Sequence, residues 1–87
     1  MEALDTNNGN VKPKLVILGA GESGVGAAIL GKQQGFEVFV SDSSEIKQGY
    51  KEQLNKEGVR YEEKQHTLKE IQTADLVIKS PGIPEAD

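Results

Sequence analysis

The sequence predicts an α/β fold in which a parallel sheet of four strands, in the order 3-2-1-4, carries helices on both faces. Three observations support this. Short apolar, β-branched runs alternate with helical patterns from residue 14 onward, glycines end the two longer helical patterns, and a glycine-rich turn follows the first run. Strand–helix alternation with short connections indicates parallel strands that are joined by right-handed crossovers.

The first half of the chain contains two strands around one helix. Residues 15–18 form a continuous apolar run, which is typical of a strand buried on both faces. A helix is expected from Ser23 to about Gln34, and Gly35 ends it. The second strand covers residues 36–40 and gives way to polar residues at 41–42.

The next helix and strand follow the same rule. Ser43 or Ser44 can cap a helix that runs to about Glu57 and ends at Gly58. Residues 59–62 then alternate between apolar and polar side chains, as an edge strand does. The sequence thus places a third strand beside the second.

A short helix and a last strand complete the pattern. Thr67 and Glu70 have the spacing of a capping box, which predicts a helix that starts after Thr67. His66, the only histidine, is expected to be solvated or to cap this helix. Residues 75–79 are the fourth strand, and residues 80–84, Ser-Pro-Gly-Ile-Pro, form the loop that leaves it.

Composition limits the class of protein. Residues 1–13 are predicted to be a flexible tail and residues 14–87 to be one domain, whose sheet stops short of a complete dinucleotide fold. The net charge of −4 argues against a nucleic-acid partner, and no apolar run reaches the roughly 20 residues that cross a bilayer. The absence of cysteine excludes disulfides and thiolate metal sites and fits a cytoplasmic protein.

The glycine-rich turn at residues 19–24, Gly-Ala-Gly-Glu-Ser-Gly, is the strongest motif. It follows a buried strand and opens a helix, the setting of a Rossmann-like phosphate-binding turn. Gly19 permits the tight turn, Gly21 lets a diphosphate approach the backbone, and Gly24 lets helix and strand pack closely. The N–H groups at the helix start then face the anion. A turn without a ligand is the alternative.

Two further positions end strands at the same edge of the sheet. Asp42 lies 18 residues after Gly24 and can accept hydrogen bonds from a ribose diol or a base edge, although it can equally be a helix cap or turn residue. Ser80 opens the loop after the fourth strand. In a 3-2-1-4 sheet this loop and the glycine turn flank the crevice where ligands bind, so the loop is either a site or a connector.

Three segments together resemble the N-terminal domain of the Mur ligases of bacterial cell-wall synthesis, in particular those that add D-glutamate to UDP-N-acetylmuramoyl-L-alanine. They are residues 16–24, 40–43 and 74–84. The resemblance implies an ATP-dependent ligase of three domains. The first binds the UDP part of the substrate, the second ATP and Mg²⁺, and the third D-glutamate. This chain alone would be inactive, with no catalytic residue, metal or cofactor of its own.

The same resemblance implies roles for individual residues. The turn from Gly21 through Glu22 and Ser23 to Gly24 would hold the diphosphate. Asp42 and Ser43 would read the uracil edge, and Ser44 cannot provide the stacking side chain that often follows. The diphosphate–sugar side would meet three loop residues, Ser80, Pro81 and Gly82.

Two other classes of function remain open from the residues alone. The chain could be the NAD(P)-binding half of an oxidoreductase, in which Asp42 would bind the adenosine ribose, or a regulatory domain that senses a nucleotide. The resemblance favours the ligase. It implies UDP-N-acetylmuramoyl-L-alanine as the bound partner, D-glutamate and ATP as partners of the other domains, and a cytoplasmic, monomeric protein that contacts neither nucleic acid nor membrane.

Overall fold

The computed structural model describes residues 12–80 and confirms the predicted sheet. Its four strands are all parallel and lie in the order β3-β2-β1-β4. The tail at residues 1–11 and the loop residues Pro81 and Gly82 lie outside the described residues. The strand bounds are β1 Lys14–Leu18, β2 Glu37–Asp42, β3 Arg60–Glu63 and β4 Leu76–Lys79.

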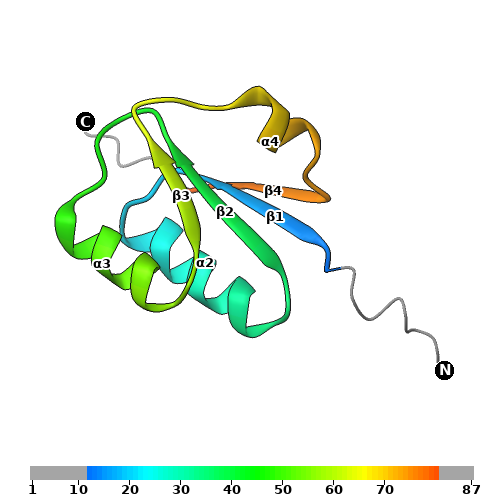
Figure 1. Cartoon of the computed structure of the whole chain (residues 1–87), viewed down its shortest axis with the longest axis horizontal. Helices are drawn as coiled ribbons and strands as arrows, with labels where there is room; N and C mark the ends of the chain where they lie inside the picture. The colour runs from blue at the N-terminus through cyan, green and yellow to red at the C-terminus, as the bar shows by residue number, and fades with distance from the viewer. Residues whose placement is uncertain (1–11, 81–87) are drawn as a thin grey trace, which may run out of the picture.

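Helices cover both faces of the sheet, as predicted. The bounds are α2 Glu22–Gln33, α3 Gln48–Lys56 and α4 Leu68–Gln72. Helices α2 and α3 lie together on one side of the sheet, and α4 lies on the other (Figure 1). This follows from the right-handed crossovers, because the connection from β3 to β4 passes the sheet in the opposite direction from the first two.

The main core lies between the sheet and the pair α2 and α3. It consists of apolar side chains that are at most 4% exposed: Leu15, Ile17, Ala20, Val25, Ala28, Val38, Val40, Ile46, Leu54 and Val59. Small residues let α2 approach the strands. A Cβ added at Gly31 would lie 2.7 Å from Cδ2 of Leu15, so the bare face of this helix packs directly on the sheet.

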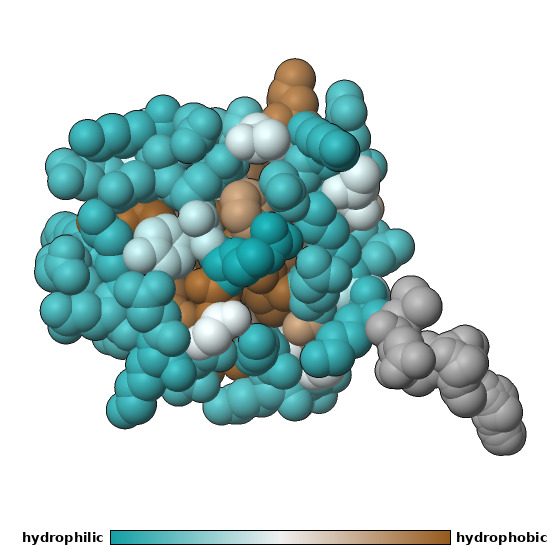
Figure 2. All heavy atoms as spheres, viewed as in Figure 1, coloured by the Kyte–Doolittle hydropathy of each residue, from teal (hydrophilic) through white to brown (hydrophobic). Residues whose placement is uncertain are grey.

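The opposite face of the sheet is covered by α4 and the loop before it. Val16 and Phe39 are buried there. Lys14 Nζ donates to Glu70 Oε1 at 2.6 Å and to Thr73 Oγ1 at 2.7 Å, which attaches α4 to β1. Polar side chains cover most of the molecule in Figure 2, and apolar side chains are visible between them near its middle.

The predicted cap of the second helix is wrong. Helix α3 begins at Gln48 with Lys47 as its N-cap, so neither Ser43 nor Ser44 caps it. The Ser44 N–H instead donates to Asp42 Oδ1, which forms a turn directly after β2. Burial of Ile46 explains the late start, because the chain between strand and helix must first turn inward to place this side chain in the core.

The predicted capping box is also wrong, although Thr67 is the N-cap residue of α4. Thr67 Oγ1 donates to Glu62 Oε1 at 2.6 Å, and Glu70 bonds Lys14. A carboxylate on the preceding strand and a lysine on β1 therefore replace the pair that the spacing predicts. The predicted strand and helix ends otherwise differ from the structure by one or two residues.

Strand β4 is the least covered strand. Its apolar side chains Leu76, Val77 and Ile78 are 47%, 41% and 37% exposed, whereas their partners on β1 are buried. In the part of the chain that the structure describes, no helix is long and apolar enough to cross a membrane.

Candidate functional site

The glycine turn joins β1 to α2 with the geometry that its sequence predicts. Gly19 has a φ of +109°, which a residue with a side chain rarely adopts. A Cβ on Gly24 would lie only 1.9 Å from the carbonyl oxygen of Gly19, so this position accepts no side chain. Gly21 has open space around it, with no other group within 4 Å of an added Cβ. The opening at Gly21 faces outward, where a ligand can approach the backbone.

The start of α2 presents unpaired hydrogen-bond donors. Gly21 is the N-cap and has no side chain to bond the helix end. The first helical bond runs from Val25 N–H to the Gly21 carbonyl at 2.9 Å. The N–H groups of Glu22, Ser23 and Gly24 donate to no acceptor among residues 12–80. These donors, at the positive end of the helix dipole, are suited to an anion.

Asp42 holds the turn in place from the neighbouring strand. Its Oδ2 accepts the N–H of Ala20 and its Oδ1 the N–H of Ser44, both at 2.8 Å. A carboxylate offers about four acceptor positions, so two remain. Asp42 therefore has the turn role, which was one of the two predicted alternatives. It also keeps two acceptor positions for a ligand.

A polar cluster around the buried Ser41 fixes the end of β2 just before Asp42. The Ser41 hydroxyl is fully buried and donates to Glu62 Oε2 at 2.7 Å, while His66 Nδ1 lies 2.5 Å from Ser41 Oγ. Because Ser41 has one proton and donates it to a carboxylate, His66 Nδ1 serves best as the donor to Ser41. His66 is exposed, as the predicted solvated role requires, and the contact with Ser41 is an additional one that the sequence does not predict.

Hydrogen bonds hold the pKa of Glu62 below its ordinary value of 4.5. Burial by itself raises the pKa of this carboxyl, but the side-chain and backbone donors of Thr67 and the hydroxyl of Ser41 outweigh burial. A charged Glu62 therefore keeps β2, β3 and the start of α4 together behind the site.

Ser80 completes the edge of the sheet. Its N–H donates to the Leu18 carbonyl at 2.9 Å, and its Cβ lies 3.1 Å from where a Cβ of Gly19 would be. The fold thus brings Ser80, the first residue after β4, against the glycine turn, as the strand order requires. The other two predicted residues of this loop, Pro81 and Gly82, lie outside the described residues.

An open hollow of about 340 Å³ lies at this edge. It is lined by Ala20, Gly21, Glu22, Asp42, Glu45, Lys47 and Tyr50. Of the predicted site residues, Gly21, Glu22 and Asp42 meet here, and Gly24 is buried beneath the turn. Ser23 and Ser43 are exposed and do not line the hollow.

Sequence reasoning missed three of the lining residues: Glu45, Lys47 and Tyr50. They lie on α3 or just before it, and no motif marks them. Ile46, Tyr50 and Leu54 lie four residues apart, a spacing that predicts only that they face the core. Tyr50 does pack against the core, and in addition it lines the hollow.

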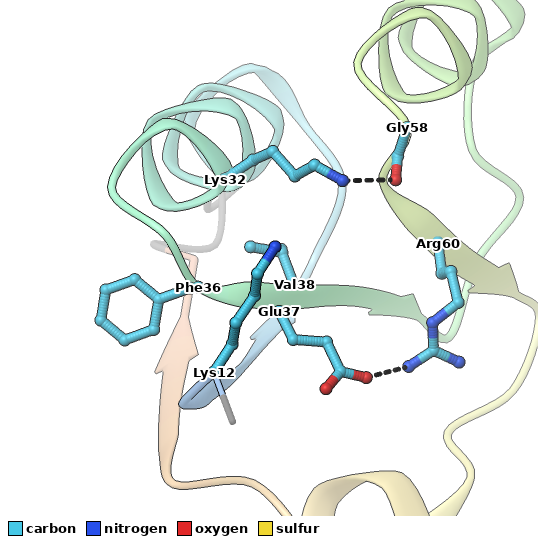
Figure 3. Close-up of a pocket in the computed structure, with 7 residues that line it drawn as sticks. All are labelled: Lys12, Lys32, Phe36, Glu37, Val38, Gly58 and Arg60. Atoms are coloured by element: carbon cyan, nitrogen blue, oxygen red, sulfur yellow. Dashed lines mark hydrogen bonds and ion pairs between the residues drawn. The ribbon is translucent and has the colours of Figure 1, made fainter. Parts of the chain in front are cut away.

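A second hollow, of about 310 Å³, lies at the amino ends of the strands and is bordered by Lys12, Lys32 and Arg60 (Figure 3). Two of these cations already have partners. Lys32 Nζ donates to the Gly58 carbonyl at 3.1 Å, and Arg60 bonds Glu37 at 3.4 Å. Ligands of parallel sheets bind at the carboxyl ends of the strands, so the first hollow is the candidate site.

Comparison with known proteins identifies the family of the chain. The family model described as the MurD N-terminal domain matches residues 14–87. The chain belongs to this family. Similar curated proteins are named UDP-N-acetylmuramoylalanine–D-glutamate ligase. Those from Bacteroides thetaiotaomicron and Bacteroides fragilis are 59% and 56% identical over 71 residues, and that from Christiangramia forsetii is 53% identical over 72.

These matches cover 82–83% of the chain but only 16% of each relative. Membership therefore extends to the first domain of such a ligase, and the remaining length of the relatives has no counterpart in these 87 residues.

Proposed function

We propose that this chain is the domain that binds the UDP part of UDP-N-acetylmuramoyl-L-alanine in a cytoplasmic, monomeric ligase that adds D-glutamate to this substrate in peptidoglycan synthesis. One observation carries the proposal. The unpaired N–H groups at the start of α2 and the carboxylate of Asp42 adjoin one hollow at the carboxyl end of the sheet. The names of the relatives supply the substrate.

The two halves of UDP differ in what they need. The diphosphate needs hydrogen-bond donors and positive potential, which the N–H groups from Glu22 to Gly24 supply. Uracil has an N–H donor on its pairing edge, which a carboxylate can accept, and Asp42 has acceptor positions left. We assign the diphosphate to the helix start and the base to Asp42 and Ser43, with Ser80, Pro81 and Gly82 toward the sugar.

The full-length enzyme would use ATP and Mg²⁺ to activate the substrate carboxylate as an acyl phosphate. Among residues 12–80, no group of three His, Cys, Asp or Glu side chains could hold a metal ion. We therefore assign no residue of this chain to either cofactor or to the chemical step. The role of this domain is to hold the nucleotide end of the substrate.

Amide chemical shifts of labelled protein, titrated with UDP and separately with NAD, test the proposal. We expect UDP to shift the amides of residues 19–24, Asp42 and Ser80, and to bind more tightly than NAD. If NAD shifts residues 19–24 and Asp42 while UDP leaves them unmoved, the domain is the cofactor half of an oxidoreductase instead.

A further inference from the structure

The side chains around the hollow of about 340 Å³ carry more negative than positive charge. Glu22, Asp42 and Glu45 contribute three carboxylates, and Lys47 contributes one ammonium group. A diphosphate placed in the hollow would meet net repulsion. The hollow is therefore suited to a neutral group that donates hydrogen bonds, and the diphosphate belongs at the rim, on the N–H groups of α2.

Tyr50 gives this hollow an aromatic wall. It lies in the first turn of α3, and its N–H donates to the Lys47 carbonyl at 3.0 Å, so helical bonding fixes its backbone. The side chain is half-buried, packs against the main core and borders the hollow. Core contacts on one side reduce its freedom and leave a pre-oriented apolar surface on the other.

We propose that Tyr50 is a specificity-determining residue that stacks on the nucleobase, with Asp42 accepting from the edge of the same ring. The inference rests on the proposed function. Tyr50 would supply the stacking contact with the base that Ser44 cannot make. Stacking needs a planar ring, and a neutral ring avoids repulsion from the carboxylates of the hollow, which fits a pyrimidine. Lys47 at the same wall can reach a carbonyl oxygen of the base.

Substitution tests this role directly. Loss of one base–aromatic stack weakens binding by roughly 5- to 150-fold. We expect Tyr50→Leu to weaken UDP by a factor in this range and to leave the weaker binding of inorganic pyrophosphate unchanged. Tyr50→Phe keeps the ring and should stay within about threefold of the original chain. Tyr61→Phe is the matched control, because Tyr61 packs on the same core from β3 but does not line the hollow.

Fluorescence gives a readout that does not depend on a destabilised variant. The chain has no tryptophan and two tyrosines, so Tyr50 is the only strong emitter in Tyr61→Phe. UDP should quench this emission, whereas pyrophosphate should not. The inference fails, and the proposed function stands, if UDP shifts the amides of residues 19–24 but neither quenches Tyr50 nor weakens in Tyr50→Leu. If UDP shifts no amide at all, both are wrong.

Discussion

Single atoms at glycine positions decide how the turn and α2 fit together. Gly21, Gly24 and Gly26 lie within six residues of one another, yet their surroundings differ. A Cβ added at Gly24 would lie 1.9 Å from the Gly19 carbonyl oxygen, whereas a Cβ added at Gly21 or Gly26 would have no other group within 4 Å. The glycine pattern alone does not separate these three cases. In the fold, Gly24 is required because no side chain fits there, Gly26 is not required, and Gly21 leaves room for a ligand.

Alanine at each position should therefore give three different outcomes. Gly24→Ala should destabilise the fold by about 3 kcal/mol or more, since backbone must move. Gly26→Ala, on the exposed face of α2, should stabilise it by up to about 1 kcal/mol. Gly21→Ala meets no steric obstacle, so it should lower stability by at most about 1 kcal/mol, the cost of Ala at an N-cap, and should weaken UDP binding. Urea unfolding and a UDP titration of the three variants check this, and equal destabilisation by all three would contradict it.

Asp42 has a structural as well as a proposed binding role. Asp42→Ala removes the acceptor of two backbone N–H groups, those of Ala20 and Ser44. We expect a loss of about 1–3 kcal/mol in the free energy of unfolding and a loss of similar size in UDP affinity. Ser44→Ala is the control, because the backbone donor remains and both quantities should be unchanged. Denaturant unfolding with calorimetric titration separates the two effects. A stable Asp42→Ala variant with unaltered affinity would falsify both assignments.

At the scale of the elements, three glutamates join different strands, helices and loops. Glu63 accepts from the Ile46 N–H and from Lys51 Nζ, which ties β3 to α3 and the loop before it. Glu70 joins α4 to β1 through Lys14, and Glu62 joins β3 to the start of α4. These bonds keep the pKa of Glu63 and of Glu70 below 4.5, as other donors do for Glu62.

The sign of the pH dependence follows from these lowered pKa values. A carboxyl with a lower pKa in the folded state stabilises the fold above its unfolded value near 4.5, and this contribution is lost as pH falls through the folded pKa. We expect the urea midpoint to be flat near pH 7 and to drop below about pH 4.5. The triple variant Glu62→Gln, Glu63→Gln, Glu70→Gln should show a shallower drop and a lower midpoint at neutral pH. An unchanged slope would show that other groups cause the acid loss.

At the scale of the whole molecule, one segment resembles an ATP-binding loop in sequence but not in its place in the fold. Residues 26–33, Gly-Ala-Ala-Ile-Leu-Gly-Lys-Gln, come close to the G-x-x-x-x-G-K-[ST] pattern of an ATP-binding loop. Gln33 replaces the hydroxyl residue that would bind Mg²⁺, and the segment lies inside helix α2, so its N–H groups are not free to hold phosphates.

We therefore expect this chain to show neither ATP affinity nor ligase turnover. Calorimetry with ATP and Mg²⁺ should give no binding heat, and UDP measured in the same way should. ATP binding that survives Lys32→Ala would place a nucleotide site elsewhere on the chain. ATP binding that this substitution removes would show that residues 26–33 hold phosphate after all.

The sequence by itself determined the strand order, the two-sided arrangement of helices and the glycine turn. Local periodicity identifies the strands and helices, and the general right-handedness of crossovers between parallel strands then limits how they can be arranged. Gly19, with its positive φ, and Gly24, against the Gly19 carbonyl, confirmed the roles that the motif predicts. The assignments of Ser43, Ser80 and the diphosphate donors stay predictions until a ligand is tested.

Only the tertiary structure decided which side chains share a partner. Thr67 bonds Glu62 rather than its own helix, and Tyr50 belongs to the wall of the hollow as well as to the core. The first case depends on how the chain turns between β3 and α4, and the second on residues of the glycine turn and β2 that are distant from α3 in sequence. A spacing rule considers only hydrogen bonds within the helix, and it fails where a stronger acceptor, here the charged carboxylate of Glu62 five residues earlier on β3, lies within reach of the same hydroxyl.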